Sequence, residues 1–335
     1  MWRSFLCSVV LALLLAACGG QPTTLPPAEG ASPQPQPSES STLPEAPPDE
    51  PPDEPDVSAW LSQSQPLPAA PQEVEIPTSD GSPLAGFYFP AKVNPAPIVV
   101  LMHWAGGDMR DWAAMAPWLQ NRPDELADSD VLSGAQIDGP WLDPTWFPPL
   151  VAEASFGVLV FDYSGFGQSA FSSSADALLQ DSLAAMMFAS TLKGADPNML
   201  LSAGASIGAD GTVDGCYLFN QAVAAGEAEG LCLAALSLSP GNYLASEFTY
   251  MQAVAELSQA EHRVFCLAAE GDVQSADVCV QSEAAFSTPF LYPGDAHGMS
   301  LVDPTMHPSA PAVEANALQL LLDLFAMATG WPVAN

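Results

Sequence analysis

The stretch that decides the fold is residues 200–208, which read Leu-Leu-Ser-Ala-Gly-Ala-Ser-Ile-Gly. Apolar residues lead directly into Gly204, Ser206 and Gly208, which match the G-x-S-x-G pattern of a nucleophile elbow between a strand and a helix. The serine of such an elbow is exposed at the edge of a sheet, and the two glycines leave room across the sharp turn. An ordinary turn between a strand and a helix has the same five-residue pattern, so the surrounding chain has to distinguish the two.

Short apolar runs alternate with segments of helical period on both sides of this stretch. Strands are expected at Val74–Ile76, Leu84–Phe89, Ile98–Met102, Phe156–Phe161, 200–205, Leu231–Leu238, Arg263–Ala269 and Pro289–Tyr292, and helices at 109–121, 175–192, 207–225, 247–260, 276–286 and 313–328. Continuous apolar runs such as Ile98–Met102 are typical of strands that are buried on both faces. The alternation predicts an α/β domain with a mostly parallel, doubly wound sheet.

One long segment, residues 122–150, shows no clear period. It is rich in Asp, Pro and aromatic residues, among them Trp141, Trp146 and Phe147. Aromatic side chains in such an insertion either pack on the core or form the wall of a pocket.

A serine nucleophile needs a base, and the chain has only four histidines from which to choose. His103 ends an early strand, where it would support an oxyanion loop. His262 precedes a strand and would lie at the wrong edge of the sheet. His297 follows the last predicted strand, at the edge where ligand groups collect in open α/β sheets, so it is the preferred base. His307 is the second choice.

The acid that orients the base is sought after the strand that ends at Ala269. Asp272 lies there, in Glu-Gly-Asp, at the carboxyl edge of the sheet. Glu270 and Asp295 are alternatives, and Asp272 by itself would also suit a solvated loop. The chain order Ser206, Asp272, His297 is one of the orders known for a serine triad.

Together these motifs resemble the α/β-hydrolase superfamily, near its dienelactone-hydrolase and serine-esterase branch. The resemblance covers most of residues 73–335 and is carried by 204–208, 162–169, 270–272 and Ala-His-Gly at 296–298. It implies an α/β-hydrolase fold, with a mostly parallel eight-stranded doubly wound sheet and helices on both faces. It also implies Ser206 as nucleophile, His297 as base and Asp272 as acid.

The resemblance further implies an oxyanion hole, with one backbone N–H from Ile207 and one from the loop after His103. The family usually has His-Gly at that loop, whereas this chain has His103-Trp104. The departure leaves open whether Ala105 or Trp104 supplies the second N–H, and the larger side chain would narrow the pocket. The implied activity is hydrolysis of an ester or amide through an acyl-enzyme, most simply that of a carboxylesterase of class EC 3.1. No cofactor or metal is expected, because no spacing resembles a zinc site or a phosphate-binding loop.

The first 17 residues indicate a signal peptide, because one positive charge precedes an apolar run that is too short to span a bilayer. Leu15-Ala16-Ala17-Cys18 resembles a bacterial lipobox, which implies cleavage before Cys18 and lipidation of its thiol. Plain secretion with cleavage near Ala17 is the alternative. Residues 18–71 are rich in Pro, Ser and acidic residues, which predicts a disordered tether between a membrane and a domain at 72–335.

The charge of the chain is strongly unbalanced. Lys and Arg total 6 against 39 Asp and Glu, for a formal net charge of −33. Such a surface repels nucleic acid and anionic lipid headgroups, so no nucleic-acid partner is expected. Adaptation to salt or to acid would each account for this charge.

Four cysteines remain in the predicted domain, and an even number permits disulfides outside the cytoplasm. The natural local pairs are Cys216 with Cys232 and Cys266 with Cys279, although three connectivities are possible. Free buried thiols are the alternative.

Three functions therefore stand at this point. The first is a lipid-anchored, extracytoplasmic serine esterase that acts on a small ester or amide. The second is a serine peptidase of the same fold. The third is a non-catalytic lipoprotein that uses the fold to bind a ligand, since fold alone does not determine function.

Overall fold

The computed structural model describes residues 67–126, 142–169, 174–244, 248–303 and 316–333. The predicted signal peptide, Cys18 and most of the predicted tether lie outside these residues, as do Trp141 and His307. Within the described ranges, no helix combines the length and the apolar character needed to cross a membrane.

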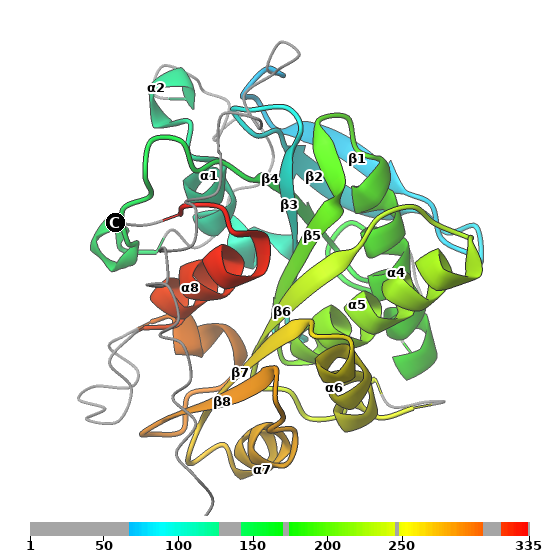
Figure 1. The fold of residues 1–335 in the computed structure, drawn as a ribbon, viewed down its shortest axis with the longest axis vertical. Coiled ribbons are helices and arrows are strands. Elements are labelled where there is room, and N and C mark those ends of the chain that lie inside the picture. The colour runs from blue at the N-terminus through cyan, green and yellow to red at the C-terminus, as the bar shows by residue number, and fades with distance from the viewer. Residues whose placement is uncertain (1–66, 127–141, 170–173, 245–247, 304–315, 334–335) are drawn as a thin grey trace, which may run out of the picture. The chain divides into compact units, whose positions relative to one another are not determined.

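An eight-stranded sheet forms the centre of the domain (Figure 1), in the order β1-β2-β4-β3-β5-β6-β7-β8. The strands are β1 (Gln72–Ile76), β2 (Leu84–Phe89), β3 (Ala96–Met102), β4 (Gly157–Phe161), β5 (Ala195–Ala205), β6 (Cys232–Leu238), β7 (Arg263–Ala269) and β8 (Ser287–Tyr292). Strand β2 pairs antiparallel with β1 and β4, and all the other pairs are parallel. The predicted mostly parallel, eight-stranded sheet is confirmed.

Helices cover both faces of this sheet. The structure has α1 (Met115–Gln120), α2 (Pro123–Leu126), α4 (Ala175–Thr191), α5 (Ile207–Ala225), α6 (Tyr250–Gln259), α7 (Val273–Gln281) and α8 (Ala317–Thr329), with 3-10 turns at Met109–Trp112, Pro144–Trp146 and Gly298–Val302. Figure 1 shows α1 and α8 on one side of the strands and α4, α5 and α6 on the other. The doubly wound arrangement follows from this division.

Strand β3 shows why both faces need cover, because all seven of its residues are buried. Val99 and Leu101 belong to the core beneath α1 and α8, whereas Ile98 and Val100 belong to the core beneath α4 and α5. Side chains alternate between the two faces of a strand, so a continuous apolar run fills both cores.

Four predicted helices have different bounds in the structure, and the helix expected at 313–328 begins at Ala317, after the N-cap Asn316. The helix expected at 109–121 is interrupted after Trp112, because Pro117 has no N–H for the carbonyl of Ala113 and is accommodated only in the first turn of α1. The helix expected from residue 247 begins at Tyr250, where Thr249 and Gln252 form a capping box.

The helix expected at 276–286 occupies Val273–Gln281 instead. Its N-cap residue is Asp272, three residues after the end of β7. It ends at Ser282, whose hydroxyl donates a 2.9 Å hydrogen bond to the Cys279 carbonyl. Ser side chains that bond to local backbone in this way compete with helix continuation.

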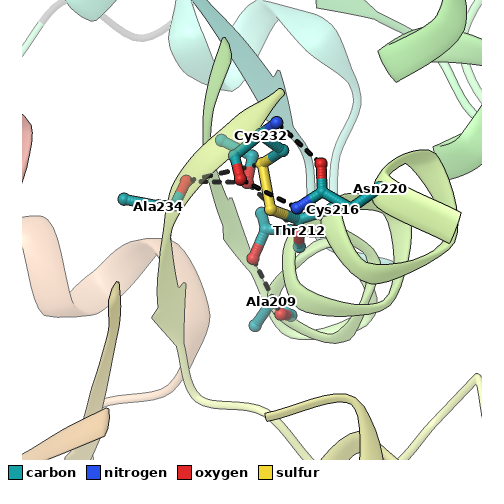
Figure 2. Close-up of a disulfide and its surroundings, with 7 residues drawn as sticks. Ala209, Thr212, Cys216, Asn220, Cys232 and Ala234 are labelled. Carbon is teal, nitrogen blue, oxygen red and sulfur yellow. Dashed lines mark hydrogen bonds between the residues drawn. A yellow bond between two sulfur atoms is a disulfide. The ribbon is translucent and has the colours of Figure 1, made fainter. Parts of the chain in front are cut away.

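Two disulfides lie in the core beneath α4–α7, and they are the two local pairs that the sequence suggested. Cys216 in α5 pairs with Cys232 in β6, and Cys266 in β7 pairs with Cys279 in α7. Figure 2 shows the first pair, with Asn220 beside it exchanging hydrogen bonds of 2.9 and 2.8 Å with the backbone of Cys232. Each disulfide therefore links a helix to a strand on the same face, and disulfides are typical of oxidising compartments.

The described aromatic residues of the 122–150 segment pack on the core. Trp146 and Phe147 are partly buried against the apolar cluster beneath α1 and α8, and Phe147 meets Trp118 edge-on at 5.1 Å. This arrangement agrees with the core-packing interpretation of these two residues.

The backbone just before β1 also packs on the domain. Gln120 donates a 2.7 Å hydrogen bond to the Ala69 carbonyl, and Arg122 donates one of 2.7 Å to the Leu67 carbonyl. Residues 67–71, which the sequence assigned to the tether, are therefore anchored to the domain.

Candidate active site

Ser206 occupies the sharp turn between β5 and α5, with φ 54° and ψ −115°. Such a backbone conformation costs about 1–3 kcal/mol for a non-glycine residue and persists only where its surroundings hold it. A Cβ on Gly204 would lie 2.2 Å from the Gly208 carbonyl oxygen, and one on Gly208 would lie 2.2 Å from that of Met102. The G-x-S-x-G pattern is thus explained by close backbone approach on both sides of the serine.

Ser206, His297 and Asp272 form a hydrogen-bonded chain, although they come from three different loops. His297 Nε2 lies 2.9 Å from Ser206 Oγ, and His297 Nδ1 lies 2.7 Å from Asp272 Oδ2. A carboxylate only accepts, so Nδ1 carries the proton and Nε2 is free to accept the serine hydroxyl. Asp272 is largely buried, whereas the His297 side chain is 35% exposed.

Asp272 lies at the N-cap position of α7, but its side chain makes no capping hydrogen bond there. Its carboxylate faces His297 instead. The carboxylate thus bonds to the imidazole in place of the free N–H groups of the helix start.

The loop that carries His297 is fixed to the end of β6 by the residue that follows the histidine. The Gly298 N–H donates a 3.0 Å hydrogen bond to Ser239 Oγ. Ser239 itself is buried and has a positive φ of 58°. The position of His297 is therefore fixed through its ring and through the backbone N–H of the residue that follows it.

The loop after β3, residues 103–112 and here called the β3 loop, is anchored by His103. Tyr163 donates its backbone N–H to His103 Nε2 at 3.0 Å, so Nδ1 carries the proton and donates to the Trp104 carbonyl at 2.8 Å. Burial lowers the pKa of His103, which keeps the ring neutral. Because a trans peptide points its N–H away from its C=O, the Ala105 N–H is directed away from the His103 ring.

Trp104 connects the β3 loop to the loop after β8 that carries His297, residues 293–298 and here called the histidine loop. Its indole N–H donates to Asp111 Oδ2 at 2.8 Å, and its ring lies against Gly298, where a Cβ would come within 2.8 Å. Burial raises the pKa of Asp111, and the hydrogen bond from Trp104 opposes that shift. The tryptophan that departs from the family pattern is therefore a fixed wall between the two loops.

Asp162, at the end of β4, ties the β3 loop to the next loop along the sheet. Its carboxylate accepts the backbone N–H groups of Met109 at 2.8 Å and Gln168 at 2.7 Å. Burial raises the pKa of Asp162, and these two hydrogen bonds lower it. The 162–169 stretch, part of the family resemblance, thus has a structural role at this edge.

The structure places the other sequence candidates away from this chain of hydrogen bonds. Glu270 and Asp295 are exposed, and the acid that meets His297 is Asp272. His262 lies between α6 and β7, at the amino end of β7. The four cysteines of the disulfides are buried beneath the sheet. Among the described residues, no cluster of His, Cys, Asp or Glu could hold a metal ion.

The loop after β6, residues 239–244 and here called the β6 loop, was missed by the sequence reasoning. Its Tyr243 ring stands edge-on to the His297 ring, with centroids 6.5 Å apart. The loop is held by Asp210, a buried residue of α5 whose pKa burial raises to about 6. The closeness of Asp210 to the elbow, four residues after Ser206, was the one available signal.

Comparisons with known proteins were made against families, curated sequences and solved structures. No protein-family model matches the sequence. The curated "Uncharacterized protein YfhR" of Escherichia coli (strain K12) is 26% identical over 151 residues, which are 44% of this chain and 43% of that protein. The chain thus matches less than half the length of this relative.

Among solved structures, the α/β-hydrolase GrgF from Penicillium sp. sh18 has a TM-score of 0.51 at 13% identity, over 79% of this chain and 100% of that one. An esterase of Pyrococcus furiosus has a TM-score of 0.45 at 14% identity, over 70% of this chain and 84% of that one. At this identity the similarity to GrgF shows the fold alone. Together with the strand order and the turn at Ser206, it shows that the chain has the α/β-hydrolase fold.

Proposed function

We propose that this protein is a serine hydrolase that cleaves an ester through an acyl-enzyme on Ser206. The single observation that carries the proposal is the continuous hydrogen-bond chain from Ser206 Oγ to His297, 2.9 Å, and on to Asp272, 2.7 Å. Each group has the partner that its role requires: an acceptor for the serine proton and a carboxylate for the imidazole N–H.

In the first step Ser206 Oγ attacks the substrate carbonyl while His297 Nε2 takes the hydroxyl proton. Asp272 stabilises the imidazolium that forms, and its short hydrogen bond keeps the ring in the right tautomer. His297 then gives the proton to the leaving group, whose departure leaves the acyl group on Ser206. A water molecule, deprotonated by His297, releases the acid and restores the serine.

The oxyanion is assigned to the backbone N–H groups of Ile207 and Ala105. Ile207 is the first residue of α5, where N–H groups have no partner within the helix. Ala105 is preferred over Trp104 because the His103 ring holds the Trp104 carbonyl and so turns the Ala105 N–H to the opposite side. Each such donor contributes about 100- to 1,000-fold in rate in other enzymes.

A small ester is preferred as substrate over a peptide. The Trp104 ring occupies space between the β3 loop and the histidine loop, which supports a narrow acyl site. A serine peptidase of the same fold uses the same groups, so a panel of short esters against peptide amides distinguishes the two functions.

We further propose an extracytoplasmic location with a lipid anchor at Cys18. The two buried disulfides support an oxidising compartment, and the lipobox-like Leu15-Ala16-Ala17-Cys18 supports lipidation. Expressed in a bacterium, the wild type is expected to partition into detergent on Triton X-114 phase separation and Cys18→Ser into the aqueous phase. A Cys18→Ser variant that partitions like the wild type would contradict the anchor.

The mechanism is tested by labelling the full-length protein with a fluorophosphonate probe, beside Ser206→Ala, His297→Ala and the control Ser190→Ala, whose hydroxyl bonds within α4. Labelling is expected in the wild type and in the control, and in neither of the first two variants. A well-folded wild type that takes no label would overturn the serine-hydrolase proposal and favour a binding lipoprotein.

A further inference from the structure

The β6 loop has features of a functional segment that the proposed mechanism does not yet use. Two of its non-glycine residues have positive φ, Ser239 at 58° and Asn242 at 60°. Conformations of this kind are unfavourable for residues with side chains and gather where the fold over-determines a site. Ser239 already supports the histidine loop through Gly298. The role of residues 240–244 of the β6 loop remains to be explained.

Asp210 holds this loop from below. It lies in α5, four residues after Ser206, and its buried carboxylate accepts the backbone N–H groups of Gly241 at 3.0 Å, of Leu244 at 3.2 Å and of Tyr243. Gln274, from α7, donates a 2.8 Å hydrogen bond to the Gly241 carbonyl. The backbone of the loop is therefore fixed by the helices that begin at Ser206 and Asp272.

These contacts give Tyr243 one position. A Cβ on Gly241 would lie 2.1 Å from the Cζ atom of the Tyr243 ring, so the ring occupies the space that any larger residue would fill. The ring stands at 80° to the His297 imidazole, with centroids 6.5 Å apart. Tyr243 is only partly buried, so it borders the site on the side of the base.

The strand order tells which side of Ser206 this is. Strand β5 lies between β3 and β6, so the β3 loop and the β6 loop flank the serine from opposite sides. The oxyanion donors belong to the β3 side and to the elbow itself. Tyr243 therefore lies on the side of Ser206 opposite the β3 loop and beside His297, the residue that passes the proton to the leaving group in the proposed mechanism.

The phenol is a hydrogen-bond donor under ordinary conditions. Burial raises the pKa of Tyr243, and the negative charges of Asp272 and Asp210 raise it further, while the hydroxyls of Ser275 and Ser206 oppose the shift. The phenol therefore keeps its proton at neutral pH.

We propose that Tyr243 is a further catalytic residue, whose phenol O–H donates a hydrogen bond to the leaving-group oxygen of an alkyl ester as its bond to the acyl carbon breaks. The proposal rests on acyl transfer at Ser206. His297 delivers the proton that the departing oxygen keeps, and the phenol retains its own. The class of substrate that gains most is an ester of an aliphatic alcohol, because an alkoxide leaves poorly without such help.

The test compares kcat/KM for ethyl acetate and for 4-nitrophenyl acetate in the full-length protein. Tyr243→Phe is expected to lower kcat/KM about 10- to 100-fold for ethyl acetate and less than about threefold for the activated aryl ester. Gly241→Ala, which retains the phenol but displaces the ring, is expected to give the same selective loss. Tyr217→Phe removes a phenol from α5 away from the site and serves as the matched control, with both values unchanged.

The outcomes separate this role from the proposed function. Equal losses on both esters, or no loss on ethyl acetate, would overturn the role of Tyr243 while leaving Ser206 in place. Release of 4-nitrophenol that persists in Ser206→Ala would overturn the serine-hydrolase proposal, and the role of Tyr243 with it.

Discussion

The β3 loop and the β6 loop flank Ser206 on opposite sides, and they are held in opposite ways. The β3 loop depends on an imidazole that burial keeps neutral, with His103 bonding the Trp104 carbonyl. The β6 loop depends on a buried carboxyl, with Asp210 accepting backbone N–H groups from three loop residues. One anchor belongs to its own loop, whereas the other lies in a helix about 30 residues earlier in the chain.

The difference shows two ways in which a buried polar side chain can fix a loop beside Ser206. A neutral histidine both accepts and donates, so a single ring turns a carbonyl and thereby aims the N–H of the next residue. A carboxylate only accepts, so it gathers several N–H groups and fixes a whole loop. The first device sets one donor, and the second positions a side chain.

The largest effect is expected on the β3 side, from His103→Ala. Losing the ring frees the Trp104 carbonyl, so the Ala105 N–H should no longer point at the oxyanion, and kcat should fall about 100- to 1,000-fold. His103→Asn retains a donor at the δ position and should recover part of that loss. Steady-state kinetics with 4-nitrophenyl acetate measures both variants, and a His103→Ala rate within threefold of the wild type would contradict the anchor role.

Removing the disulfide that links α5 to β6 should have the next largest effect and should weaken the β6 side. Cys216 and Cys232 are 16 residues apart, a loop length whose cross-link stabilises the folded state by about 3 kcal/mol. Urea unfolding of Cys216→Ser/Cys232→Ser should show a loss of that size. The double variant Cys266→Ser/Cys279→Ser, with a separation of 13, provides the comparison. An unchanged unfolding midpoint in the first variant would argue against a stabilising link.

Asp210→Asn addresses the β6 loop alone. An amide replaces one acceptor oxygen with an N–H₂ group that faces the backbone donors of the loop, so Tyr243 should lose its fixed position. We expect kcat/KM for ethyl acetate to fall about tenfold, with fluorophosphonate labelling of Ser206 preserved. If labelling fell as far as ester hydrolysis, Asp210 would be supporting the elbow rather than the β6 loop.

The smallest effect is expected from Asp214→Asn, measured as thermal stability against pH. Asp214 lies one turn after Asp210, its Oδ1 has no hydrogen-bond partner, and burial together with the Asp210 charge raises its pKa well above the usual value. The folded protein therefore holds a proton that the unfolded chain loses above about pH 4, so this residue lowers stability as pH rises.

The neutral amide has no such proton. The difference between the Tm of Asp214→Asn and the Tm of the wild type should therefore increase as the pH rises from 5 to 8. A gain of a few degrees is expected, since about 1 kcal/mol moves the Tm of a domain of this size by roughly 2–4 °C. Asp210, with a pKa of about 6, contributes the same trend in both proteins and levels off above that pH. A constant difference in Tm across the range would contradict the raised pKa of Asp214.

The sequence by itself determined the sheet and, through its motifs and their order along the chain, predicted the three residues at the edge of that sheet. Alternating apolar runs and helical periods gave the strands, because burial on both faces leaves a continuous apolar signal such as Ile98–Met102. The elbow glycines marked Ser206, and few histidines left His297 as the base. The predicted helix ends were less accurate, as near Pro117 and Ser282, because single hydrogen bonds decide where a helix stops.

Only the tertiary structure decided how the two loops beside Ser206 are held. Trp104 meets Gly298 although β3 and β8 are separated in the sheet by β5, β6 and β7, and no sequence spacing records that contact. Asp210 in the sequence looks like any acidic residue on a helix, yet packing of α5 beneath β6 buries it against the backbone of the β6 loop. A buried carboxyl needs N–H partners, and which ones it finds depends on the fold and not on its neighbours in the chain.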